Sequence, residues 1–587
     1  MKVLILASAF SGLTQRVFKE LLLLGHVVEQ HYDLNETILR DQVSHFEPDI
    51  IICPFLTQRI PEDIWRQYLC LIVHPGIEGD RGPSSLDWAI FEHMPQWGVT
   101  LLQADAEMDA GDIWDTRVFD LREASKLSVY KREVSSAAVD MIKSTLKKIE
   151  QQQISPRPLD YTRPDVKGKL RPLMKQEFRA IDWQSDASHV VVGKMNSADT
   201  SPGVLISLHD YPVYLYGAIE DASRSGHPGD IIAVYKDSVC FACATGSVWI
   251  RQMKCKQHPQ LPAIKLPAAQ VVRQLLPAHI WSDVNIESGH SVAEEIYSER
   301  EGDITYLYFN FYNGAMNTRQ CLDLKNALAS IKQTDTKYIV LMGGEDFWSN
   351  GIHLNCIEAA DDQAEESWQN INAMNDLVLE IIDSPDHMTI AALRNNAGAG
   401  GVIAALACDE VIIRDGVVLN PHYQRMGLYG SEYWTYLLPS KVGHRQAQTI
   451  TLDCEPMLAA EAFEIGLADT VFPEEWQAFH EQLKTYCRDL SQQVDLPAFL
   501  SNKGQQRQYD ESIKPLAQYR DEELTEMKRI FDDPDSRYHQ ERQAFVYKQK
   551  GRSVRTNADP LYGADSLQEP ADTSENSPLL STAGSGV

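Results

Sequence analysis

The stretch LIVHPGIEGDRGPSSLDWAI, residues 71–90, places a histidine at the end of an apolar run and follows it with a loop rich in glycine, proline, serine and charge. Around it, short apolar segments alternate with helical ones: KVLILAS, HVVEQHYDL, DIIICPF, CLIVHPG and GVTLLQAD. This alternation predicts a doubly wound, mostly parallel sheet with helices on both faces. Because ligands bind at the carboxyl ends of strands in such sheets, His74 is a candidate functional residue.

Length and charge narrow the class of protein. With 587 residues the chain is too long for one hydrophobic core. It has 54 Lys and Arg against 83 Asp and Glu, and the net charge of -29 argues against a general nucleic-acid-binding protein, whose surface is basic. No apolar run reaches the roughly 18 residues of a membrane span, and the first residues lack the basic region of a signal peptide. We expect a cytoplasmic multidomain enzyme with no nucleic-acid or membrane partner.

The pattern along the chain predicts an α/β multidomain protein in five parts. A linker rich in proline and charge, residues 151–173, separates the first sheet from a series of alternating strands, and helical periodicity at 320–332 and 364–384 marks a second α/β unit. The expected parts are a doubly wound α/β domain (1–165), a small OB-like β-barrel (166–280), a second α/β domain (281–475), a C-terminal helical region (476–556) and a disordered acidic tail (557–587).

The ten cysteines are scattered, and only Cys240 and Cys243 form a C-x-x-C pair. A structural zinc site needs a second pair. We therefore predict free thiols and no metal site.

A general base must be held in one tautomer by a partner, and His74 needs such a group. The segment EMDAGDIW, 107–114, offers Asp109 and Asp112 in a glycine-containing loop that follows the strand GVTLLQAD. A carboxylate there can orient and charge-stabilise the imidazole. After the first strand, SAFSGLTQR lacks the dinucleotide pattern G-x-G-x-x-G but places Arg16 early in a helix, where an anion can bind.

The motifs VHP, RGPSS, WAI, GVTLLQ and MDAGDI resemble the catalytic domain of the 10-formyltetrahydrofolate-dependent transferases and hydrolases, which include methionyl-tRNA formyltransferase. RAIDW and SPGV resemble the second domain of that family. The resemblance implies that His74 and Asp109 polarise the formyl group of 10-formyltetrahydrofolate and shuttle protons there. It also implies a folate pocket shaped by Arg81, Gly82 and Asp112.

One departure bears on the chemistry of this site. The family has an asparagine two residues before the histidine, whose amide stabilises the tetrahedral oxyanion, and this chain has Ile72 there. Loss of such a donor costs about 2.7–4 kcal/mol in comparable sites. A thiol acceptor needs less help than an amine because thiolate is intrinsically a good nucleophile.

A second chemical site is predicted by GGEDFWSNGIHL (343–354) and RNNAGAGGVIAALACDEVIIR (394–414), which place glycines where strands end and helices begin. Together they resemble the crotonase family, the enoyl-CoA hydratases and isomerases. The resemblance implies that the backbone N–H groups of Ile352 and Gly400 grip a thioester carbonyl. Where hydratases carry two glutamates, this chain has Ile403 and His422, so ordinary hydration is not expected.

The segment NPHYQRMGLYGSEYWTYLLP, residues 420–439, lines the crotonase-type pocket by the same resemblance. We expect an acid or base of the second site among its polar side chains: His422, Tyr423, Tyr429 and Glu432.

The fusion of these two domain types resembles the HypX/HoxX family of hydrogenase maturation factors. It implies transfer of the formyl group to coenzyme A, decarbonylation of formyl-CoA to CO and CoA, use of the CO as a ligand of the iron in [NiFe]-hydrogenase, and other maturation proteins as partners. Because CoA is anionic, basic residues must anchor it. The candidates are Arg16, Lys548, Arg552 and Arg555.

Two alternatives remain open at this point. One is an amine formyltransferase fused to an unrelated acyl-CoA-modifying domain. The other is a non-catalytic scaffold that binds folate and CoA during hydrogenase maturation; Ile72 and Ile403 favour it, whereas His74 with Asp109 argues against it.

Overall fold

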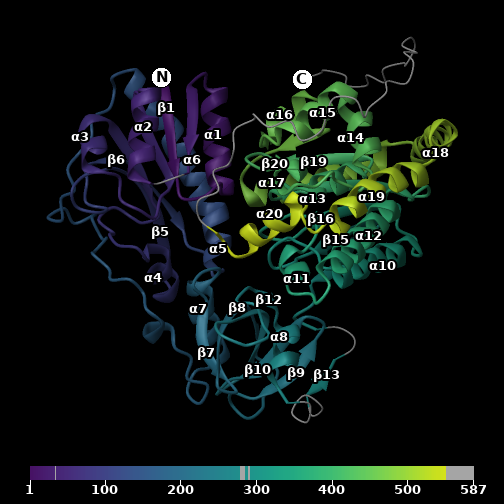
Figure 1. Ribbon diagram of the computed structural model, residues 1–587, viewed down its shortest axis with the longest axis horizontal. Helices are drawn as coiled ribbons and strands as arrows, with labels where there is room; N and C mark the ends of the chain where they lie inside the picture. Colours follow the sequence, from purple (N-terminus) through teal and green to yellow (C-terminus); the bar gives the residue numbers. More distant parts are fainter. Residues whose placement is uncertain (33–34, 278–283, 288–290, 550–587) are drawn as a thin grey trace. The chain divides into compact units, whose positions relative to one another are not determined.

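Figure 1 shows the computed structural model, which describes residues 1–32, 35–277, 284–287 and 291–549. Three predictions therefore lie outside the described residues: the acidic tail 557–587, Arg552 and Arg555. The described residues belong to one compact body. It has three parts, called here the first, second and third units, and the first unit is built on the N-terminal sheet.

The N-terminal sheet has the strand order β2-β1-β3-β4-β5-β6. The first four strands in this order are parallel, and β5 and β6 are each antiparallel to the preceding strand. The strands are β1 (Lys2–Ala7), β2 (Val27–His31), β3 (Ile50–Phe55), β4 (Leu69–His74), β5 (Gln96–Gln103) and β6 (Ile113–Asp120). The helices are α1 (Gly12–Leu23), α2 (Glu36–Phe46), α3 (Glu62–Gln67), α4 (Ser85–Phe91), α5 (Lys126–Val129), the π-helix η1 (Tyr130–Val134) and α6 (Ser135–Glu150).

Both faces of this sheet are buried, as its apolar strands require. In β1, Val3 and Ile5 belong to one hydrophobic cluster, whereas Leu4 and Leu6 belong to another on the opposite face. Successive side chains of a strand alternate between faces, so a strand that is apolar throughout needs helices on both sides. The predicted doubly wound sheet is confirmed.

The second unit is a mostly antiparallel sheet in the order β13-β9-β10-β11-β8-β7, with β12 added beside β11. Its strands are β7 (Val204–Leu208), β8 (Tyr211–Asp221), β9 (Ile231–Tyr235), β10 (Ser238–Ala242), β11 (Ser247–Cys255), β12 (Leu266–Pro267) and β13 (Asn285–Ile286). The helices are the 3-10 helix η2 (Gln176–Arg179), α7 (Ser188–Ala198) and α8 (Ala268–Leu275).

All ten cysteines of the chain are free, as predicted.

The third unit contains a largely parallel sheet in the order β14-β15-β16-β17-β19-β22 and a small sheet β18-β20-β21. The strands of the large sheet are β14 (Ile296–Glu301), β15 (Ile304–Phe309), β16 (Tyr338–Gly343), β17 (Met388–Leu393), β19 (Glu410–Arg414) and β22 (Thr470–Phe472). Those of the small sheet are β18 (Ala397–Gly398), β20 (Val418–Asn420) and β21 (Met457–Leu458). The helices are α10 (Thr318–Lys332), α11 (Leu354–Glu358), α12 (Gln363–Ile382), α13 (Gly400–Leu406), η3 (Tyr423–Met426), α14 (Trp434–Val442), α15 (His444–Asp453) and α16 (Ala459–Glu464).

Four helices follow: α17 (Trp476–Gln493), α18 (Leu496–Ile513), α19 (Leu516–Asp532) and α20 (Arg537–Val546). Leu524, Met527 and Phe531 of α19 belong to the same hydrophobic cluster as β15, β16 and α12. In contrast, α18 buries none of its side chains. The helix α19 is therefore part of the core of the third unit.

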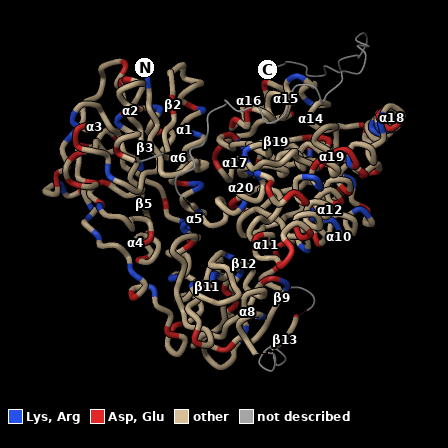
Figure 2. The backbone as a smooth tube through the Cα atoms, viewed as in Figure 1, with Lys and Arg blue, Asp and Glu red and all other residues tan. Residues whose placement is uncertain are grey.

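Acidic and basic residues are interspersed along the described backbone (Figure 2). Among the helices of the described residues, none is long and apolar enough to span a membrane.

Candidate active sites

His74 is the last residue of β4, and its side chain is 5% exposed. Its Nε2 atom lies 3.0 Å from the Oδ2 atom of Asp80, and its Nδ1 atom lies 3.7 Å from the Oδ1 atom of Asp109. The imidazole is thus placed between two carboxylates. The hydrogen-bonded partner is Asp80, whereas Asp109, the predicted partner, lies beyond hydrogen-bond distance.

Sequence reasoning missed Asp80 although it stands in the same loop, six residues after the histidine. Its side chain is fully buried, and its Oδ1 atom lies 3.3 Å from the Nε atom of Arg171. A buried carboxylate needs such a counter-charge. Arg171 lies near the end of the linker 151–173, too far along the chain for the sequence to reveal the pairing.

The three residues predicted to shape the folate pocket make different contacts. Gly82 donates its N–H to Asp109 at 3.1 Å, and its φ of +116° leaves room only for glycine, since a Cβ would lie 2.2 Å from the Arg171 carbonyl oxygen. Arg81 forms an ion pair with Glu107. Asp112 is exposed, and its carbonyl accepts a hydrogen bond from the Gln103 N–H at 2.8 Å.

In the third unit, the residues predicted to grip a thioester lie on two adjoining loops. A Cβ built on Gly351 would come within 3.3 Å of the Gly400 nitrogen, and Gly398 donates its N–H to the Ser349 carbonyl at 2.9 Å. Among the described residues, neither the Ile352 N–H nor the Gly400 N–H has a hydrogen-bond acceptor. Two unpaired backbone donors are what an oxyanion hole requires.

Glu432 packs directly against Gly400, because a Cβ on that glycine would lie 2.3 Å from the Glu432 Oε1 atom. The side chain is buried, and its Oε2 atom accepts a hydrogen bond from the Tyr423 hydroxyl at 2.6 Å. Burial raises the pKa of Glu432 to about 7 and raises that of Tyr423 well above its ordinary value. This carboxyl can both take and give a proton near neutral pH.

His422 is held by the carbonyl oxygen of Asn420, which lies 2.8 Å from its Nδ1 atom. Nδ1 therefore carries the hydrogen, and Nε2 is an unprotonated acceptor with no hydrogen-bond partner among the described residues. Burial lowers the pKa of His422, which favours this neutral form. Tyr429 packs against Trp434 with ring centroids 5.5 Å apart, and Ile403 is completely buried.

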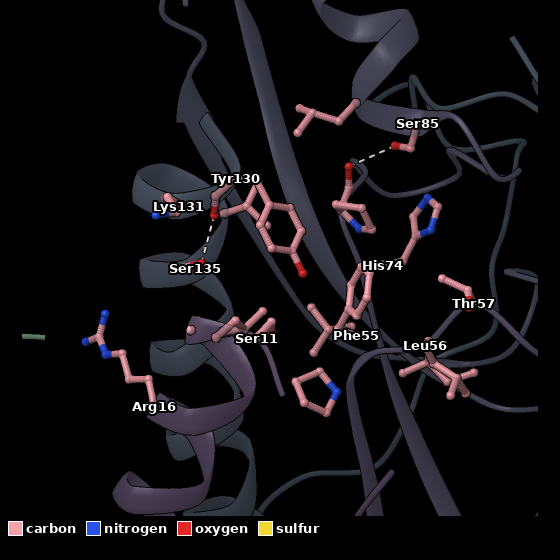
Figure 3. Close-up of a pocket in the computed structure, with 18 of the residues that line it drawn as sticks. Ser11, Arg16, Phe55, Leu56, Thr57, His74, Ser85, Tyr130, Lys131 and Ser135 are labelled. Carbon is pink, nitrogen blue, oxygen red and sulfur yellow. Dashed lines mark hydrogen bonds between the residues drawn. The ribbon is translucent and has the colours of Figure 1, made fainter. Parts of the chain in front are cut away.

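A single cavity of about 1150 Å³ is lined by residues of the first and third units, but Ile352, Gly400, Tyr423 and Glu432 are not among its described lining residues. Its walls include His74, Asp109 and Ile72 from the first unit and Gly398 and His422 from the third. Figure 3 shows the part of this cavity around His74, with Arg16, Tyr130 and Lys131 on the facing helices. Neither Tyr429 nor Arg81 is among the described residues that line it.

Several cations line the same cavity. Arg16, a predicted CoA ligand, forms a bidentate ion pair with Glu474, each N···O distance being 2.7 Å. Lys131 and Arg132 lie on η1, and burial lowers their pKa values to about 7 and about 10. The Arg132 guanidinium stacks 3.8 Å from the Trp476 ring, and no carboxylate of the described residues forms an ion pair with it. Arg59, Lys126 and Arg414 also line this cavity.

Lys548 lies outside this cavity lining, with its Nζ atom 4.1 Å from the centre of the Phe545 ring. Sequence reasoning did not single out Lys131 or Arg132. A basic pair inside a helix looks the same in the sequence whether it lines a cavity or faces solvent.

Comparison with known proteins agrees with this two-site architecture. The hydrogenase maturation factor HoxX of Bradyrhizobium diazoefficiens is 42% identical over 549 residues, which cover 93% of this chain and 95% of that protein. The chain belongs to the HoxX/HypX family of hydrogenase maturation factors. The fold is that of HypX as well. The crystal structure of HypX from Aquifex aeolicus in complex with tetrahydrofolic acid superposes on this chain with a TM-score of 0.88 and 38% identity. The match covers 94% of this chain and 96% of that one.

Parts of the chain match wider families. Residues 173–266 match the family model of the formyl transferase C-terminal domain, and residues 304–552 match that of enoyl-CoA hydratase/isomerase. The methionyl-tRNA formyltransferase of Citrifermentans bemidjiense is 26% identical over 226 residues, which cover 38% of this chain and 69% of that enzyme. The chain thus contains a formyltransferase-type part and a crotonase-type part.

Proposed function

We propose that the protein is a bifunctional, CO-producing enzyme of [NiFe]-hydrogenase maturation. It transfers the formyl group of 10-formyltetrahydrofolate to coenzyme A, then decarbonylates formyl-CoA to CO and CoA, and the CO becomes a ligand of the active-site iron. The observation that carries this proposal is the single cavity that both His74 and His422 line. A shared cavity offers one thioester a route between the two histidines.

The cavity volume is large for a single small molecule. Pockets for one small molecule measure roughly 300–1,000 Å³, and this one measures about 1150 Å³. Folate fits the first site by the family relationship, since the HypX crystal structure is a complex with tetrahydrofolic acid. For CoA, Lys131 and Arg132 are better placed than the predicted Arg16, whose charge is already neutralised by Glu474. Lys548, Arg552 and Arg555 stay predictions.

In the first reaction, the thiol sulfur of CoA attacks the formyl carbon, the bond from that carbon to N10 of the folate breaks, and the thiol proton ends on N10. His74 moves this proton. Asp80 orients the imidazole through its hydrogen bond, and Asp80 and Asp109 both stabilise the positive charge that the ring gains.

In the second reaction, the formyl C–H proton leaves, the carbon–sulfur bond breaks, and the thiolate takes a proton to give CoA and CO. The N–H groups of Ile352 and Gly400 hold the carbonyl oxygen, as the crotonase resemblance implies. The neutral Nε2 of His422, on the cavity wall, takes the formyl proton. Glu432, paired with Tyr423, supplies a proton to the leaving thiolate, for which a pKa of about 7 suits it.

The two half-reactions are tested separately on the whole protein. His74→Ala is expected to abolish formyl-CoA formation while CO release from supplied formyl-CoA continues. A formylated amine as product, with no formyl-CoA, would instead favour an amine formyltransferase, and binding of both substrates without any turnover would favour a scaffold.

A further inference from the structure

Two consecutive residues of the crotonase-type site have left-handed backbone conformations. Glu432 has φ of +64° and Tyr433 has φ of +61°, and neither is glycine. Residues with a Cβ rarely adopt this conformation because the Cβ crowds the backbone carbonyl oxygen, so it persists only where surrounding contacts enforce it. The turn places the Glu432 carboxyl against Gly400. What holds the turn therefore determines where this carboxyl lies.

The enforcing contacts come from the C-terminal helix α19. The Glu523 side chain, which is completely buried, accepts the Tyr433 N–H at 2.9 Å, the Thr435 N–H at 2.8 Å and the Thr435 hydroxyl at 2.5 Å. Because α14 begins at Trp434, these N–H groups belong to the helix N-terminus, where no intrahelical acceptor exists. Glu523 thus caps α14 from a distant part of the chain.

A second helix holds the other side of the same turn. Asn375 of α12 donates a hydrogen bond to the Ser431 hydroxyl at 2.6 Å, and Arg520 of α19 forms an ion pair with Asp376 of α12 at 2.7 Å. The turn is clamped between α12 and α19. The backbone N–H groups of Tyr433 and Thr435, however, both donate to Glu523.

We propose that Glu523 is a positioning residue for CO release: by capping α14 it fixes the Glu432–Tyr433 turn and so holds the Glu432 carboxyl beside the oxyanion donor Gly400. The inference rests on the proposed second reaction and extends the catalytic machinery into the C-terminal helices. Without the cap, the strained turn relaxes and the carboxyl moves away from the thioester.

Glu523 acts on Glu432 through the geometry of the turn. Burial raises the pKa of Glu523 to about 8, although its hydrogen bonds from Tyr433 and Thr435 lower it, and the neighbouring Glu432 raises it further. Facing Glu432 are Tyr423 of η3, which donates to it, and the Cys321 thiol of α10, whose pKa burial raises. Glu432, with a pKa of about 7, therefore ionises at lower pH than Glu523.

The test is the full-length Glu523→Gln variant, with CO release from supplied formyl-CoA measured between pH 5.5 and 9. We expect kcat to fall roughly tenfold or more across this pH range, while KM for formyl-CoA stays nearly unchanged. Formyl-CoA formation in the first site is the internal control and should proceed at the wild-type rate. Asp495→Asn, which alters the N-cap of α18, is the matched capping control and should leave both reactions unchanged.

An unchanged kcat in Glu523→Gln across this pH range would overturn the inference while leaving the proposed function intact. If that variant does not fold, Thr435→Val removes only the hydroxyl donor, and CO release should still fall severalfold. A wild-type rate in Thr435→Val with loss of both reactions in Glu523→Gln would make Glu523 a structural residue only. Failure of the wild-type protein to release CO would instead refute the proposed function.

Discussion

The Nε2 atom of His74 lies 3.0 Å from the Oδ2 atom of Asp80, a carboxylate that is itself buried beside Arg171. The histidine is therefore oriented by a residue of its own loop, and Asp109 faces the other nitrogen from the strand-end loop of β5. This arrangement leaves the Nδ1 side of the ring toward Asp109, a cavity-lining residue, and the proposed function places the formyl group there.

Asp80→Asn should slow formyl-CoA formation by roughly 10²-fold or more, because an amide neither fixes the imidazole tautomer nor stabilises its positive charge. The rate of tetrahydrofolate formation measures the effect. Asp120→Asn, at the exposed end of β6, is the control and should keep the wild-type rate. An equal rate in Asp80→Asn would mean that Asp109 alone orients His74.

His422→Ala should slow CO release and let formyl-CoA accumulate, since the free Nε2 is the proposed acceptor of the formyl proton. Glu432→Gln should also slow CO release, but it should in addition remove the ionisation near pH 7 from the pH profile. Quantifying formyl-CoA and CO together at several pH values separates the two roles. Supplied formyl-CoA that gives CO at the normal rate with His422→Ala would show that another group is the base.

Gly398→Leu tests whether the thioester travels through the shared cavity. A Cβ at this position would lie 3.2 Å from the Asn350 Oδ1 atom and 3.3 Å from the His422 ring, so a larger side chain narrows the passage. Formyl-CoA should then form in the first site and accumulate or escape while CO production falls at least tenfold. Gly504→Leu, in open space on α18, is the matched control. Undiminished CO from 10-formyltetrahydrofolate and CoA would contradict the shared route.

The affinity for CoA should fall as pH rises. The pKa of Lys131 is lowered by burial to about 7, so its amine is charged below that pH and neutral above it. A cationic Lys131 attracts the CoA phosphates, and KM for CoA is therefore expected to increase between pH 6.5 and 8.5. Lys131→Met should show a high KM that depends much less on pH. The same increase in this variant would assign the effect to another group.

The doubly wound sheet could be predicted because its strands are short, apolar throughout and separated by helical periods; the alternation of β1 to β5 with α1 to α4 follows directly. The helices predicted at 320–332 and 364–384 match α10 and α12 closely for the same reason. His74 and the loops of Ile352 and Gly400 were identified because strand ends and glycine-rich turns are local features.

Contacts between distant segments were not predictable in this way. Arg16 has the local sequence of an anion site, yet the fold pairs it with Glu474, 458 residues away. Glu523 stands in a polar helix and becomes buried only because α19 packs against α14. Asp80 was within reach of sequence reasoning, but nothing in a loop of mixed charges distinguishes a buried carboxylate from a solvated one.

The most direct measurement is CO formation by the purified wild-type protein. The protein is mixed with 10-formyltetrahydrofolate and CoA, and CO is trapped by a reduced haem protein and followed by its absorption spectrum. The account predicts one CO for each tetrahydrofolate formed, with CoA regenerated. Formate or a formylated amine in place of CO, under conditions in which tetrahydrofolate is produced, would contradict it.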